Sequence, residues 1–295
     1  MAVISDFIYP LPKGTTHQSN RPILGIFILF GLALAGLLQA PRLIASYQFQ
    51  QGLQSYDEGD YQESALAFRQ VIQYDSDNAD AYYNLGLALS QAGELDQAIA
   101  AYRKSLELTP TNAEDIHLSL GDALQDLGRH DEAIAAYQET IVLNSHSARA
   151  YTNLAALLYQ RGDVDGAITA ARKAVELKPK NAEALVTLGA ALLDQGHLEQ
   201  ASTKLKRAIK LKPNEAMAHN NLGTALFQQQ QADKAIAAYQ KAIELDPKLA
   251  IAHSNLGLVL SRQGKQTEAL TEAEKAVELD AKSPKSRYAL VVSQR

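Results

Sequence analysis

Apolar residues recur along most of this chain at the three- and four-residue spacing of amphipathic helices, in short segments separated by polar breaks. The segment Ala79–Asn112 shows the pattern in full. Its apolar and small positions are Tyr82, Leu85, Gly86 and Leu89, followed by Ala98, Tyr102 and Ser105. A polar break over residues 91–94 separates the two halves, and Pro110 closes the segment. This pattern predicts a helix, a tight turn, a second helix and a stop.

Related segments follow one another without a linker from residue 45 to residue 283. Their predicted boundaries are 45–78, 79–112, 113–147, 148–181, 182–215, 216–249 and 250–283. The third is one residue longer than the others because Gly121 falls one place late, which predicts a bulge or a shift in its first helix. One such unit cannot bury its apolar faces alone, so the pattern predicts an all-α stack of repeats.

Small residues occupy corresponding places in both halves of several repeats. We expect the glycines of the first helices to face alanines of the second helices and to let the two helices approach closely. The expected pairs are Gly86 with Ala98, Gly189 with Ala201, Gly223 with Ala235, and Gly257 with Ala269.

The chain before the repeats divides into a polar tail and an apolar run. Residues 1–21 show no helical period, so we expect a flexible tail. Residues 23–40 contain no charge and would rise about 27 Å as a helix, so residues 22–42 are predicted to form a single transmembrane helix. A cleaved signal peptide is the alternative, although its apolar region is usually shorter. After the repeats, residues 284–295 are predicted to form a capping helix, with a disordered tail as the alternative.

Composition and motifs argue against several classes of protein. Charged residues make up 21% of the chain and the net charge is -5, which does not favour nucleic-acid binding. The absence of cysteine excludes disulfides, thiolate zinc sites and a cysteine nucleophile. No phosphate loop, metalloprotease motif or nucleophile elbow is found. We therefore expect no enzyme activity, no cofactor and no metal site.

The repeats resemble the tetratricopeptide repeat. The matching residues are Tyr82, Leu85, Gly86, Leu89, Ala98, Tyr102 and Pro110, and they recur as Leu185, Leu188, Gly189, Leu192, Ala201, Leu205 and Pro213. The resemblance implies a right-handed α-solenoid of about seven helix–turn–helix repeats after the transmembrane helix. It also implies a concave groove, lined by the first helices, that holds a client protein or an extended peptide segment.

Helical phase identifies the residues that would line this groove. Asn84, Asn153, Asn221 and Asn255 share one repeat position, and some members of the family use such an asparagine ladder to bind peptide backbone. The alternative is that asparagine is simply common and solvated there. The other predicted groove residues are Asp80, Tyr83, Leu87, Arg149, Thr152, Ala156, Tyr159, Asn220, Thr224 and Phe227. The set lacks the basic pairs that clamp a terminal carboxylate, so that kind of client is not expected.

Basic residues gather over residues 172–212, mainly in predicted second helices, and should lie on the outer surface. They are Arg172, Lys173, Lys178, Lys180, Lys204, Lys206, Arg207, Lys210 and Lys212. This cluster could bind an acidic partner or anionic lipid; the alternative is a solvated helix face.

These features predict a membrane-anchored interaction scaffold that holds client proteins for assembly, maturation or regulation. The architecture is similar to bacterial and cyanobacterial membrane-anchored assembly factors, which would imply pigment synthesis or photosystem biogenesis. The membrane would be a bacterial plasma membrane or a thylakoid. Lys13 and Arg21 before the span and Arg42 after it leave the side of the repeats undecided. The alternative is an accessory subunit of an envelope secretion, pilus or cell-wall machine with its repeats outside the cytoplasm.

Overall fold

The computed structural model describes residues 41–294, and all regular structure in that range is helical. Residues 41–58 belong to the first helix of the first repeat. The other first helices are α3 (Ala79–Gln91), α5 (Ala113–Asp126), α7 (Ala148–Gln160), α9 (Ala182–Asp194), α11 (Ala216–Gln228) and α13 (Ala250–Arg262). The second helices are α2 (Tyr61–Tyr74), α4 (Leu95–Glu107), α6 (His130–Leu143), α8 (Val164–Leu177), α10 (Leu198–Leu211), α12 (Ala232–Leu245) and α14 (Gln266–Leu279). The last helix is α15 (Pro284–Ser293).

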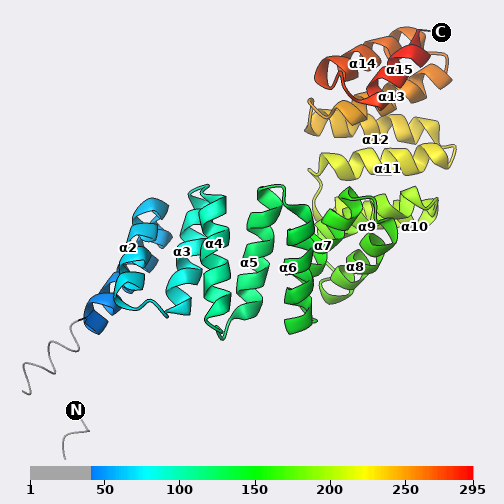
Figure 1. Cartoon of the computed structure of the whole chain (residues 1–295). Helices are drawn as coiled ribbons and strands as arrows, with labels where there is room; N and C mark the ends of the chain where they lie inside the picture. The colour runs from blue at the N-terminus through cyan, green and yellow to red at the C-terminus, as the bar shows by residue number, and fades with distance from the viewer. Residues whose placement is uncertain (1–40, 295) are drawn as a thin grey trace, which may run out of the picture.

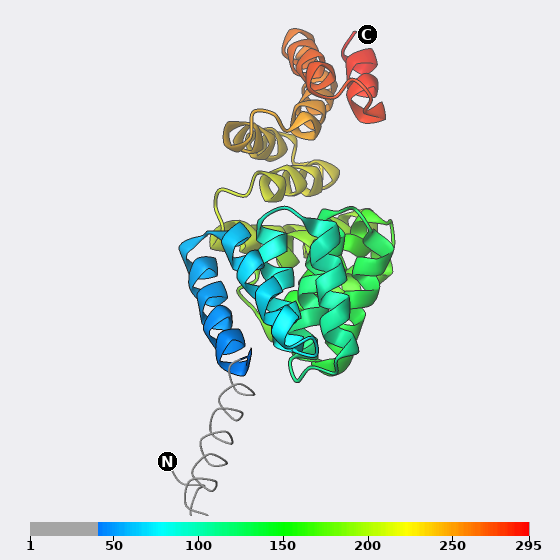
Figure 2. The ribbon, with the colours of Figure 1, turned by 60° about the vertical axis from the view of Figure 1, so that its left-hand side comes forward.

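The helices stack in chain order into a curved solenoid (Figures 1 and 2). Each first helix from α3 onward packs most extensively on the second helix of its own repeat, and each second helix then packs on the next repeat. Successive first helices also touch: α3 contacts α5, α7 contacts α9, α9 contacts α11, and α11 contacts α13. Second helices within residues 41–294 make no comparable contact with one another. The first helices therefore lie along the inner, concave surface of the curve.

A left-handed backbone residue joins the two helices of each repeat. Six repeats use a glycine here, with φ between +76° and +85°, and no atom lies within 4 Å of where a Cβ would be. The glycines are Gly59, Gly93, Gly128, Gly162, Gly196 and Gly264. Because the space is open, the backbone conformation is the reason for glycine. The sixth repeat places Gln230 at this position with φ +62°.

Most glycines in the first helices pack differently from the sequence prediction. Gly257 does face Ala269 as predicted, since an added Cβ would lie 3.1 Å from the Ala269 carbonyl oxygen. In the second repeat, a Cβ on Gly86 would lie 2.5 Å from the Tyr102 ring. In the fifth repeat, a Cβ on Gly189 would lie 2.6 Å from Leu205 Cγ. The expected alanine partners, Ala98 and Ala201, are fully buried but are not the nearest atoms. The absent side chain thus makes room for the large residue one turn beyond the alanine.

The fourth repeat reaches the same close approach with two small residues. Ala155 and Ala171 occupy the places that hold glycine and a large side chain in the neighbouring repeats. Both alanines are fully buried. The third, fourth and fifth repeats thus combine either glycine with a large side chain or alanine with alanine at these two positions.

The extra residue of the third repeat does not distort its first helix, so the predicted bulge is wrong. Helix α5 is a continuous α-helix. The helix has 14 residues, whereas the other first helices from α3 onward have 13, and its additional residue lies ahead of Gly121, which agrees with the predicted shift. The connection before α5 is also one residue longer than the other connections between repeats, and its Thr109 has φ +53°. Asn112 precedes α5 but makes no side-chain capping bond, whereas Asn78 and Asn181 cap α3 and α9.

The C-terminal residues form α15, which packs on α13 and α14. Ser283 caps this helix by accepting a hydrogen bond from the Ser286 backbone N–H at 3.3 Å. The predicted tail, residues 1–21, and almost all of the predicted transmembrane helix, residues 22–42, lie outside the described residues. Among the helices that are described, none is both long and apolar enough to cross a membrane.

Candidate functional site

The inner surface carries most of the residues that were predicted from the sequence to line a groove. Asp80 and Arg149 are exposed, and the other accessible members of the set are half-buried. Those half-buried members are Tyr83, Asn84, Leu87, Asn153, Ala156, Tyr159, Asn221, Thr224 and Phe227. They come from α3, α7 and α11, and so they spread along the surface instead of converging on one point.

Three predicted groove residues are buried, so their side chains are not accessible on the inner surface as the sequence analysis expected. Thr152 is 6% exposed; its Oγ1 donates to the Ala148 carbonyl and accepts from Asn181 Nδ2, each at 2.7 Å. Asn220 is 1% exposed and Asn255 is 5% exposed. Asn255 Nδ2 donates to Asn220 Oδ1 at 2.8 Å. These side chains join neighbouring repeats, because adjacent first helices pack against each other at this level.

The remaining asparagines of the predicted ladder are half-buried and already bonded within the protein. Asn84 Nδ2 donates to the Asp80 carbonyl at 2.8 Å. Asn153 Nδ2 donates to Asp122 Oδ1 at 2.8 Å, and Asn221 Oδ1 accepts from Asn220 at 3.1 Å. Part of the hydrogen-bonding capacity of each amide is therefore used within the fold.

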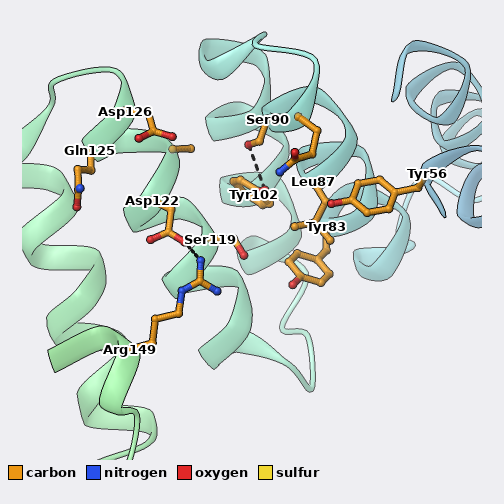
Figure 3. Close-up of a pocket in the computed structure, with 12 residues that line it drawn as sticks. Tyr56, Tyr83, Leu87, Ser90, Tyr102, Ser119, Asp122, Gln125, Asp126 and Arg149 are labelled. Carbon is orange, nitrogen blue, oxygen red and sulfur yellow. Dashed lines mark hydrogen bonds and ion pairs between the residues drawn. The ribbon is translucent and has the colours of Figure 1, made fainter. Parts of the chain in front are cut away.

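A cleft of about 490 Å³ hollows this surface in the N-terminal half (Figure 3). One side is aromatic, with Tyr56 from residues 41–58 and Tyr83 from α3. The other side is polar, with Asp122 and Asp126 from α5 and Arg149 from α7. Its volume is in the range of pockets that hold small ligands or single side chains.

Asp122 is the centre of a hydrogen-bonded cluster at the polar side of the cleft. Its Oδ1 accepts from Tyr137 Oη at 2.8 Å and from Asn153 Nδ2 at 2.8 Å. Its Oδ2 accepts from Arg149 Nη2 at 2.5 Å. Tyr137 Oη also lies 3.0 Å from Gln125 Oε1. The cluster ties α5, α6 and α7 together and fixes the direction of the polar wall.

Burial is the main influence on the protonation of this cluster. It raises the pKa of the Asp122 carboxyl above its usual value, and the charge of Asp126 adds to the rise. The hydrogen bonds from Tyr137 and Asn153 and the charge of Arg149 lower the same pKa. Burial also raises the pKa of Tyr137, and the Asp122 charge raises it further.

The cleft residues of the third repeat, Ser119, Asp122 and Asp126, were not among the predicted groove residues, because this repeat is out of register in the sequence. Counting from Gly121 instead aligns Ser119 with Asn84 and Asp122 with Leu87. The sequence did contain a feature that could have identified Asp122 as a site residue. Asp122 is charged at a position that is uncharged in every other repeat.

The predicted basic cluster over residues 172–212 lies on α8, α10 and the connections that follow them. Its residues are exposed or half-buried. Lys173 pairs with Glu176 at 2.7 Å, and Lys212 pairs with Glu215 at 3.1 Å. Most of the positive charge has no acidic partner in the described part of the chain, so the cluster forms a basic outer surface.

No group of three or more potential metal ligands occurs within residues 41–294. The two histidines at equivalent positions, His219 and His253, each place Nε2 near the carbonyl of the preceding turn proline. The distances are 2.9 Å to Pro213 O and 3.1 Å to Pro247 O. Both rings therefore have a structural hydrogen bond.

Comparison with known proteins identifies the repeats. Family profiles described as tetratricopeptide repeat match residues 49–113, 118–182 and 250–279. A profile described as TPR repeat matches residues 189–230 and 223–264. These ranges together span well over half of the chain. No protein of curated function matches its sequence.

Solved structures share the fold. The Cut9–Hcn1 hetero-tetramer of the APC/C has 19% identity and a TM-score of 0.67, covering 83% of this chain and 48% of that chain. This chain thus spans about half the length of that relative. PilF of Pseudomonas aeruginosa has 22% identity and a TM-score of 0.60, covering 71% of this chain and 95% of that chain. A thermophilic TPR protein of Thermus thermophilus has 27% identity and a TM-score of 0.51, covering 61% of this chain and 98% of that chain.

The profile matches and the structural matches agree with the helix pairs described above. Repeats of this kind build extended surfaces for protein–protein interaction. The chain belongs to the tetratricopeptide repeat proteins, and its α-solenoid is a protein-interaction scaffold.

Proposed function

We propose that this protein is a membrane-anchored scaffold that holds an extended segment of a client protein along its inner surface. The observation that carries the proposal is the continuous inner face of first helices, where half-buried apolar and polar side chains are interspersed. Tyr83, Leu87, Tyr159 and Phe227 supply apolar contacts at intervals along this face. A segment in extended conformation would cross several repeats and gain many weak contacts.

Membrane anchoring rests on the sequence of residues 23–40. Eighteen uncharged residues suffice to cross the hydrocarbon core of a bilayer. Tethering restricts the search for a client to the membrane surface and raises the effective concentration of both partners. The role is then to hold clients during assembly, maturation or regulation, with pigment synthesis or photosystem biogenesis as the proposed setting.

The basic outer surface over residues 172–212 supplies a second contact in this proposal. It would attract an acidic partner or the anionic headgroups of the same membrane. Both contacts would weaken with rising salt, because the side chains are solvent-accessible and the Debye length shortens.

Affinity capture from membranes with the full chain tests the proposal when two matched variants are included. Phe227→Ala removes a half-buried apolar side chain from the inner face. Val142→Ala removes one that is 77% exposed on α6, outside the inner face. Clients retained by Val142→Ala and lost by Phe227→Ala are the expected result. Equal retention by both variants would contradict binding on the inner face.

Protease protection in sealed membrane vesicles tests the topology. Repeats on the cytoplasmic side fit an assembly factor, whereas repeats on the opposite side fit an accessory subunit of an envelope machine. A chain that is recovered from the soluble fraction, with residues 1–42 intact, would contradict the anchor.

A further inference from the structure

The cleft in the N-terminal half differs in chemistry from the rest of the inner surface. Its aromatic side has Tyr56 and Tyr83, and Leu87 lies between them and the polar side (Figure 3). Tyr83 stands near the buried Tyr102, with ring centroids 6.1 Å apart and tilted by 46°. A fixed neighbour of this kind holds the Tyr83 ring in place. The ring therefore presents a stable face to the cleft.

The charges of Arg149 and Asp122 in the cleft offset each other as an ion pair, so the remaining charge of the cleft is negative. Arg149 is paired with Asp122, whose carboxylate is also bonded to Tyr137 and Asn153. Asp126, one turn further along α5, has no hydrogen bond or ion pair in the described part of the chain and is exposed. It leaves one carboxylate free at the rim of the cleft.

Further aspartates extend this charge around the aromatic side. Asp57 follows Tyr56 directly, and Asp115 lies one turn before Ser119 on α5. Burial is the main reason that the pKa values of Tyr56 and Tyr83 are raised, and these two aspartates raise them further. The tyrosines therefore stay neutral and sit in a negative field, which disfavours an anionic occupant.

The opposite end of the inner surface carries positive charge. Arg262 of α13 lies over the Phe227 ring of α11, with 4.9 Å between the guanidinium carbon and the ring centroid. The Arg262–Phe227 contact is also an example, within this chain, of a guanidinium bound on an inner-face aromatic ring.

We propose that the cleft between residues 41–58, α3, α5 and α7 binds an arginine side chain of the client segment. The guanidinium lies against the tyrosine rings, and the free carboxylate of Asp126 on the opposite side of the cleft attracts its charge. Its aliphatic stem contacts Leu87. Asp122 acts as a positioning residue, because its own carboxylate is used by Tyr137, Asn153 and Arg149. The inference rests on the proposed function, since it names the client chemistry that the inner face selects.

Arginine fits this cleft better than lysine for two reasons. A planar guanidinium can stack on an aromatic ring and donate to a carboxylate at the same time. It also carries less hydration to remove than a lysine ammonium. The cleft should therefore distinguish the two cations as well as select for positive charge.

The test uses a random dodecapeptide display library selected on the full chain in detergent micelles. Arginine should be enriched in the selected peptides at one position. The best peptide is then synthesised with that arginine, with lysine, and with neutral citrulline, which keeps the shape of the side chain. We expect citrulline to weaken binding about tenfold and lysine to weaken it about threefold.

Protein variants then assign the effect to the cleft. Asp126→Asn should weaken the arginine peptide about tenfold and leave the citrulline peptide unchanged. Asp96→Asn is the matched control, because Asp96 is an exposed aspartate on α4 that makes no hydrogen bond or ion pair within residues 41–294. Tyr83→Leu should also weaken binding, and Tyr83→Phe should retain it because the ring face is kept.

Four results would overturn the inference. Selected peptides without arginine, or citrulline peptides that bind as tightly, would contradict it while leaving peptide binding by the scaffold intact. A library that yields no binder would contradict the proposed function as well. An arginine-dependent dimer of the full chain that Asp126→Asn dissolves would show that a second copy, and not a client, fills the cleft.

Discussion

Replacement of Gly189 by alanine perturbs the contact that sets the spacing of the two helices in a repeat. The added Cβ would lie 2.6 Å from Leu205 Cγ and 2.8 Å from Cδ2. Leu205 is fully buried, so it has no open space into which to move. The helices or the leucine must shift by about 1 Å to restore an ordinary carbon–carbon contact of about 3.5–4 Å.

The expected free energies follow from this geometry. Overpacking a core costs about 1–3 kcal/mol, and alanine gains about 1 kcal/mol over glycine in a helix interior. Gly189→Ala should therefore destabilise the protein by about 1 kcal/mol. In a Leu205→Ala background, which itself costs about 2–5 kcal/mol, the clash is gone and the same substitution should stabilise by about 1 kcal/mol. The double variant reproduces the Ala155 and Ala171 pair of the fourth repeat.

Urea unfolding of the full chain and the three variants, followed by far-UV circular dichroism, measures this cycle. The coupling energy between the two positions should be about 2 kcal/mol, within the range known for residues in contact. The midpoint should fall when Gly189→Ala is made in the natural chain and rise when it is made in the Leu205→Ala background. An effect of the same sign and size in both backgrounds would refute the packing account.

Two further predictions concern a turn and a buried tyrosine. Gln230→Gly should stabilise the protein by up to about 1 kcal/mol in urea unfolding, because it removes a non-glycine residue from the left-handed conformation. Gly196→Gln should destabilise it for the same reason, and a change of the same sign in both variants would contradict the prediction. Burial raises the pKa of Tyr239 to about 12, so folding favours the protonated form of its hydroxyl. The contribution of this group to the free energy of unfolding is therefore fully present below pH 10 and is lost as the pH rises toward 12. Tyr239→Phe should remove about 2–3 kcal/mol of that loss, measured by urea unfolding between pH 9 and pH 12, and an unchanged pH slope in this variant would contradict the prediction.

The repeat architecture was predictable because helical period, turn glycines and closing prolines recur in one register. The partner of each first-helix glycine was not predictable from spacing alone. Alanine and the large residue one turn later lie on the same face of the second helix, and the crossing of the helices decides which one the glycine meets. In the fifth repeat that residue is Leu205, not Ala201.

The sequence predicted which helices form the inner surface, but it predicted less well which of their residues are accessible there. Helical phase placed Asn255 on the inner face, but the adjacent repeat covers it, and Asn220 accepts its hydrogen bond. Burial between repeats depends on the rotation from one repeat to the next, which a sequence pattern does not contain. Asp122 was missed for a simpler reason, since one extra residue ahead of Gly121 shifted the alignment.

Photocrosslinking tests the central claim, that a client segment lies along the inner face of the first helices. A peptide selected from the display library would carry a benzophenone group and be irradiated on the full chain, and the attachment points would be mapped by mass spectrometry. We predict attachment to first-helix residues such as Tyr83, Leu87, Tyr159 and Phe227. Attachment confined to the second helices α4, α6, α8, α10 and α12 would contradict the account.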